Sequence, residues 1–132
     1  MKKKFSASFF LMMFVISISA RAQNMSSGTH AFFTASETEI KNEVKAGSLV
    51  FYVSGLETEQ QADDFLKRSK PYSKGFSMTL GAQVNGQREC KIIFNGNPEM
   101  KWALRFFLAS GIADVKQDNS VKTVNDFFKP YL

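Results

Sequence analysis

The apolar residues between Ser48 and Pro71 change from a strand pattern to a helix pattern. A continuous run of β-branched and aromatic residues, Leu49–Val53, is typical of a strand that is buried on both faces. Thr58 and Gln61 have the spacing of a capping box, in which each side chain bonds the other residue's backbone N–H at a helix start. The apolar positions that follow share one helical stripe. We therefore expect a strand and then a helix that closes before Pro71.

Two segments of alternating apolar and polar residues flank Asn85 and Gly86 and predict a β-hairpin. A two-residue turn would set Leu80 opposite Lys91 and mix an apolar face with a charged one. A three-residue loop from Val84 to Gly86, with Gly86 in a bulge, keeps the apolar faces together. We therefore expect the bulged turn, with these pairs: Leu80 with Cys90, Met78 with Ile92, and Phe76 with Phe94.

The segment after the hairpin predicts a second helix and another strand. Asn97 and Pro98 are typical of a helix start, and Gly111 ends the apolar stripe. Ile112–Val115 then has the composition of a short strand.

Further elements flank this central region on both sides. Residues 31–33 predict a short strand, and Ser36 with Glu39 has the spacing of a second capping box. At the other end, Ser120 is a candidate cap for a helical segment that ends against Pro130. The chain therefore carries one strand–helix unit before the central region and one helical segment after it.

From Ser48 to Gln117 the expected order is β-α-β-β-α-β, which is the ferredoxin-like split βαβ arrangement. That arrangement is an antiparallel four-stranded sheet with both helices on one face, so we expect an α+β protein. The expected division is an export signal at 1–22, a strand and helix extension at 23–47, a ferredoxin-like domain at 48–117 and a helical segment at 118–132.

The connection Gly55–Gln61, between the first strand and helix of that domain, resembles the heavy-metal-associated domain family. The resemblance covers residues 48–117 and rests on the order of elements, the length and the Gly55-Leu56 step. In that family, Gly-Met-x-Cys-x-x-Cys opens the helix and holds a soft metal. Thr58 and Gln61 stand at the two cysteine positions here, and a hydroxyl and an amide do not replace thiolates. The resemblance therefore implies a retained scaffold whose metal site is lost, with no cofactor.

The first 22 residues have the pattern of an export signal: three lysines, an apolar stretch and a small-x-small cleavage site at Ala20–Ala22. This segment holds four of the 17 basic residues and none of the 12 acidic ones, so its removal lowers the net charge from +5 to +1.

A near-neutral chain without a large basic cluster is not typical of nucleic-acid binders. Of the 132 residues, 110 remain, without a second apolar run of membrane-spanning length. We expect a periplasmic or secreted domain that binds no nucleic acid and spans no membrane.

The chemically active side chains have structural explanations. Cys90, the single cysteine, shares a strand face with Ile92 and Phe94, which favours a buried thiol over a nucleophile. His30, the single histidine, lacks the partners of a metal site, so we interpret it as an incidental residue near the N-terminal end. Four acidic residues lie at the start of the first helix of the domain. The helix dipole favours acidic residues there, and we prefer this explanation to a cation-binding site. The four residues are Glu57, Glu59, Asp63 and Asp64. We therefore expect no catalytic and no metal-ligating residue.

Trp102 and Phe106 make the second helix apolar nearly all round, because they lie on a different stripe from Met100, Ala103 and Phe107. Either another part of the chain covers them, or they form an exposed surface for a partner. We favour cover by the N-terminal unit or by the C-terminal segment, whose aromatic residues also need a place to pack.

The leading hypothesis is an exported, non-catalytic binding or adaptor domain with a protein partner in the envelope. The alternative is a divergent heavy-metal-associated protein that handles metal through Cys90 and methionines. An exported hydrolase has the least support, because its general base would have to be His30.

We expect the exported protein to begin at Gln23, because cleavage follows the small-x-small site at Ala20–Ala22. N-terminal sequencing of the purified protein checks this expectation. An intact Met1 on cytoplasmic protein would contradict export and the charge argument that depends on it.

Overall fold

The computed structural model describes residues 28–132. The predicted export signal, residues 1–22, and the first residues of the predicted extension lie outside the described part of the chain.

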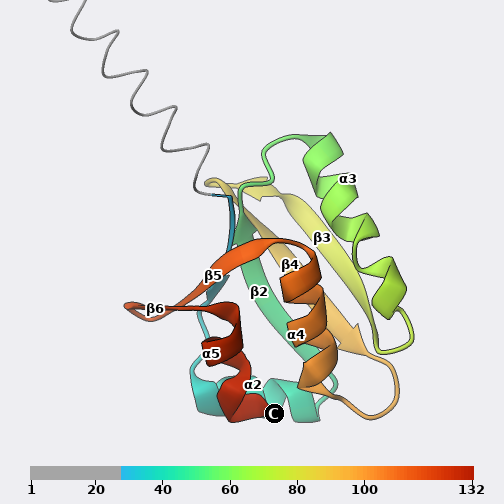
Figure 1. Ribbon diagram of the computed structural model, residues 1–132, viewed down its shortest axis with the longest axis vertical. Coiled ribbons are helices and arrows are strands. Elements are labelled where there is room, and N and C mark those ends of the chain that lie inside the picture. The colour runs from blue at the N-terminus through green and yellow to red at the C-terminus, as the bar shows by residue number, and fades with distance from the viewer. Residues whose placement is uncertain (1–27) are drawn as a thin grey trace, which may run out of the picture.

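Strands and helices follow one another along the whole described chain (Figure 1). In chain order they are β1 (Thr29–Phe33), α2 (Glu37–Lys45), β2 (Ser48–Ser54), α3 (Glu59–Lys67), β3 (Phe76–Val84), β4 (Gln87–Phe94), α4 (Met100–Ala109), β5 (Ile112–Gln117), β6 (Ser120–Lys122) and α5 (Val124–Phe128). Two 3₁₀ turns, η1 (Lys70–Tyr72) and η2 (Lys129–Tyr131), follow α3 and α5. The protein is therefore α+β, as the sequence predicts.

The strands form one mixed sheet in the order β3-β4-β2-β1-β5-β6. The predicted four-stranded antiparallel sheet is wrong, because β1 lies inside the sheet, antiparallel to β2 and parallel to β5. β1 fits this central place because Ala31 and Phe33 are buried on one face while His30 and Phe32 lie on the other. The strand–helix unit before Ser48 is thus part of the sheet.

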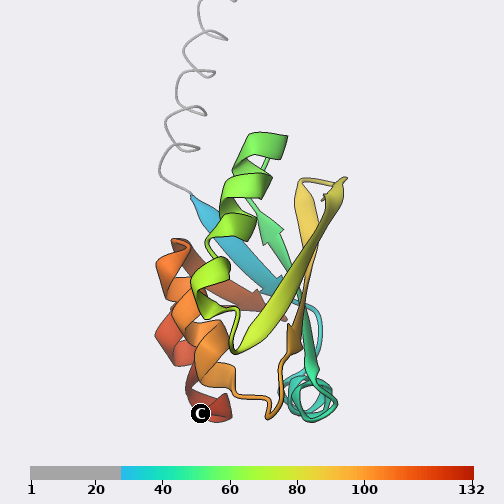
Figure 2. The ribbon, with the colours of Figure 1, turned by 90° about the vertical axis from the view of Figure 1, so that its right-hand side faces the viewer.

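Helices α3, α4 and α5 lie on one side of the sheet, whereas α2 closes one end of it (Figures 1 and 2). The core between the sheet and these helices is rich in phenylalanine. Phe33 of β1 stacks on Phe51 of β2 at 5.5 Å and on Phe127 of α5 at 4.6 Å between ring centroids. Phe107 of α4 meets Phe128 of α5 at 5.0 Å. These rings join β1, β2, α4 and α5 in one core.

Along its length, the other face of the sheet carries none of the helices of residues 28–132, and we call it the open face (Figure 2). It changes one prediction, because β2 is not buried on both sides. Leu49, Phe51 and Val53 are fully buried against the helices, but Val50 and Tyr52 are half-buried on the open face. The continuous apolar run of β2 therefore supplies apolar side chains to an uncovered surface.

The apolar pairs of the predicted hairpin are confirmed: Phe76 lies opposite Phe94, Met78 opposite Ile92 and Leu80 opposite Cys90. The predicted three-residue loop is wrong. Val84 pairs with Gln87 across a two-residue turn in which Asn85 and Gly86 both have positive φ, 53° and 79°. The extra residue that preserves the apolar pairing lies at the register shift between Leu80 and Gln83.

Arg88 holds this bulge in place. Its side chain is almost fully buried, and it donates to the carbonyl oxygens of Leu56 at 2.8 Å and Gly81 at 3.2 Å. Its third contact is with the exposed Glu59 carboxylate at 3.3 Å. One cation therefore ties the β3 bulge to the start of α3.

Two predicted helix starts also differ from the structure. Ser120 lies in β6, which pairs with β5, and the cap of α5 is Thr123, whose hydroxyl accepts from the Asp126 N–H at 3.1 Å. The second helix begins at Met100 rather than directly after Asn97, and Glu99 occupies its N-cap position without a side-chain hydrogen bond.

Candidate functional site

Thr58 and Gln61, at the positions that resemble the metal motif, form the predicted capping box. The Gln61 N–H donates to Thr58 Oγ1 at 3.1 Å, and the Thr58 N–H donates to Gln61 Oε1 at 3.0 Å. The same amide oxygen also accepts from the Glu57 N–H at 2.8 Å. Both side chains therefore form hydrogen bonds that cap the N-terminus of α3. Within residues 28–132, no three His, Cys, Asp or Glu side chains gather as a metal site would require.

Cys90 is fully buried, as its place among apolar side chains predicts. Burial, with the nearby charge of Glu89 as a smaller cause, raises the pKa of the Cys90 thiol far above its ordinary value. The sulfur therefore stays protonated at neutral pH and acts as a small apolar group in the core.

His30 is not an incidental terminal residue, and that interpretation is wrong. It lies in β1 on the open face, with Nδ1 2.6 Å from Oδ1 of Asp114 in β5. Asp114 is 84 positions away in the sequence, so no local pattern indicates the contact. The pair ties the central strand to its parallel neighbour.

Trp102 and Phe106 do not form one exposed surface. Phe106 is fully buried against Phe65 of α3 and Phe76 of β3, with ring centroids at 5.2 and 5.9 Å. Trp102 is half-buried, and its ring lies so close to Gly75 that a Cβ there would come within 2.2 Å. The C-terminal segment, expected as a cover, packs on Phe107 instead. The cover comes from α3, from Gly75 and from the start of β3, and the sequence did not indicate these contacts.

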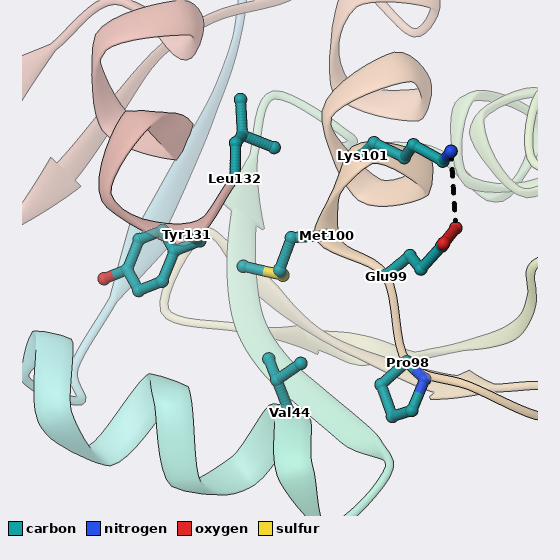
Figure 3. Close-up of a pocket in the computed structure, with 7 residues that line it drawn as sticks. All are labelled: Val44, Pro98, Glu99, Met100, Lys101, Tyr131 and Leu132. Atoms are coloured by element: carbon teal, nitrogen blue, oxygen red, sulfur yellow. Dashed lines mark ion pairs between the residues drawn. The ribbon is translucent and has the colours of Figure 1, made fainter.

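A surface groove that sequence reasoning missed lies between α2, the start of α4 and η2 (Figure 3). Its cavity measures about 360 Å³. An adjoining cavity of about 280 Å³ shares four of its residues and extends along α2. We call the two together the α2–α4 groove, lined by Lys41, Val44, Lys45, Pro98, Glu99, Met100, Lys101, Pro130, Tyr131 and Leu132.

The floor of the α2–α4 groove is apolar. Val44 of α2 lies across from Met100 of α4, and Tyr131 and Leu132 form the third side (Figure 3). Val44 reaches the groove because α2 docks through the fully buried Ile40, one turn earlier on the same helix face. Burial is the main cause that raises the pKa of the Tyr131 hydroxyl, and it favours the neutral form further.

The rim of the groove is basic. Lys101 forms an exposed ion pair with Glu99 at 3.5 Å, and Lys41 pairs with Glu37 at 3.1 Å. Exposed pairs of this kind are weak, so both lysines remain able to contact another molecule. Lys45 adds a third ammonium at the last turn of α2. The arrangement suits an apolar side chain that is flanked by acidic groups.

Comparison with protein-family models, curated proteins and solved structures finds no match to this chain. The resemblance to the heavy-metal-associated domain family therefore stays a prediction from the sequence. None of the helices within residues 28–132 has the length and apolar character that crossing a membrane requires.

The raised pKa of the Cys90 thiol predicts a pH dependence of stability. In the unfolded chain the thiol ionises near pH 8.5, whereas in the folded protein it keeps its proton to higher pH. Unfolding above about pH 8.5 therefore releases a proton, so the free energy of unfolding should fall as the pH rises, with a slope that approaches about 1.4 kcal/mol per pH unit well above that pH. Urea denaturation between pH 8 and 9.5 measures the slope. Cys90→Ala is the control, and an equal slope in that variant would contradict the assignment.

Proposed function

We propose that this chain is an exported, non-catalytic binding or adaptor domain of the periplasm or the extracellular space. In this proposal the α2–α4 groove holds an apolar side chain of a protein partner, and the basic rim contacts acidic residues beside it. The groove carries the proposal because it is open, apolar at its floor and about 360 Å³ in volume. That volume lies within the range of sites that hold small ligands and side chains.

The other candidate residues each have a structural role in the fold, and these roles leave the groove as the candidate binding site. Thr58 and Gln61 serve the start of α3, Cys90 belongs to the core and His30 is paired with Asp114. Each of these contacts is sufficient to explain why that residue type occurs at its position. The α2–α4 groove is different, because its apolar walls leave open space between them.

The scaffold in this proposal is a ferredoxin-like core that has lost its metal site and has been widened by β1 and β6. Without those two strands, the observed order becomes β3-β4-β2-β5. In that order β4 lies between the two strands of the β2-α3-β3 unit, as a split βαβ arrangement requires.

Partner capture through the groove is tested with a photo-crosslinking residue in place of Lys101, on the exposed rim. We expect the exported protein to capture one envelope protein in living cells, with the product identified by mass spectrometry. Val44→Glu should abolish capture, because it places a carboxylate on the apolar floor.

Asn42→Glu is the matched control, because it adds the same charge on the exposed side of the same helix, away from the groove. We expect this variant to retain capture. Capture that survives Val44→Glu, or equal capture from a crosslinker at the distant Asp63 of α3, would contradict the proposed function.

A further inference from the structure

The open face of the sheet carries a row of side chains that runs across four neighbouring strands. Strand pairing sets Glu89 of β4 opposite Tyr52 of β2, Tyr52 opposite Phe32 of β1, and Phe32 opposite Lys116 of β5. The two aromatic residues are half-buried, whereas Glu89 and Lys116 are exposed. We call these four residues the aromatic row. It has two aromatic rings at its centre, an anion at one end and a cation at the other.

This order is self-complementary. A two-fold axis parallel to the strands, placed between Tyr52 and Phe32, turns a second copy face to face with the first and reverses the row. Tyr52 of each copy then meets Phe32 of the other, and Glu89 of each meets Lys116 of the other. Such an isologous contact needs a surface whose two halves complement each other, and that is the pattern of the aromatic row.

The next row towards the β3–β4 turn agrees with the same axis. Gln87, Ser54, His30 and Asp114 are consecutive partners across β4, β2, β1 and β5. The rotation sets the Gln87 amide, which has N–H donors, opposite the Asp114 carboxylate, which accepts. It sets Ser54 opposite His30, again a pair that can share a hydrogen bond. In both rows the axis brings no two like charges together.

We propose that the open face is the contact through which two copies of this chain form a dimer, with the aromatic row at its centre. This dimer is independent of the proposed function, because the α2–α4 groove lies at the end of the sheet beside α2. A second copy fits the face better than an unrelated protein, because its charges are opposite on the two sides of the aromatic pair. Aligned sheets pack within about 30° of each other, and the long Glu89 and Lys116 side chains accommodate that rotation.

Within one copy, Lys116 already has an alternative contact. Its Nζ lies 5.4 Å from the centroid of the Phe32 ring, so the lysine partly covers the apolar face. Dimer formation would move this ammonium from the ring to Glu89 of the second copy. Because the face combines aromatic and polar groups, we expect a reversible dimer that dissociates on dilution rather than an obligate one.

Charge reversal tests the proposed geometry. The dissociation constant of the exported protein, expressed from the full chain, is measured by sedimentation equilibrium over a range of concentrations at low salt. Glu89→Lys and Lys116→Glu should each weaken the dimer at least about tenfold, because each sets two like charges face to face at both symmetry-related positions. The double variant exchanges the charges and should restore association to near the wild-type value.

Asp63→Lys, on the exposed surface of α3, is the matched charge reversal outside the open face, and it should leave the dissociation constant unchanged. Circular dichroism confirms that each variant is folded. A wild-type protein that stays monomeric at every concentration would overturn the proposal. A dimer that the single reversals leave intact, or that the double reversal fails to restore, would overturn it as well.

Discussion

The place of β1 between β2 and β5 is the constraint on which the rest of the structure depends. β1 pairs with β2 on one side and with β5 on the other, and its parallel pairing with β5 makes the sheet mixed. Phe33, at the end of β1, contacts β2, α4 and α5 through Phe51, Phe107 and Phe127. On the helix-bearing side of this sheet, α5 packs beside α4 through Phe128 and Phe107. α5 is the element that completes the cover, which is why Phe127 and Phe128 are fully buried.

Both candidate binding surfaces also follow from the place of β1. Because β1 and β2 are adjacent and antiparallel, their connection α2 stays at one end of the sheet and crosses neither face. There it meets the start of α4 and the chain after α5, and these three segments enclose the α2–α4 groove. On the opposite side of the sheet, β1 contributes Phe32 and His30 to the open face. The same five residues therefore supply the core, position α2 and place an aromatic ring on the open surface.

Local signals in the sequence predict local structure well. The spacing of Thr58 and Gln61 predicts a capping box, and both hydrogen bonds are present. The alternation of β3 and β4 predicts which residues face each other, because a shift of one position would place a charged face against an apolar one. The site of the bulge does not follow from that alternation. It depends on Arg88, which reaches Gly81 and Leu56 through contacts that no short pattern encodes.

Long-range features account for the remaining differences. Five residues of β1 show that a strand is present but do not show its neighbours, so the sheet order was not predictable from them. The contact of His30 with Asp114 depends on that sheet order. The α2–α4 groove depends on three segments that meet only after folding, and none of them carries a sequence motif for binding.

Nuclear Overhauser effects between backbone protons of β1 and its two neighbours test the central place of β1 most directly. The structure predicts cross-strand effects that join Ala31 both to Val53 of β2 and to Val115 of β5. Direct effects between β2 and β5, without any to Ala31, would show a sheet from which β1 is absent and would contradict this account.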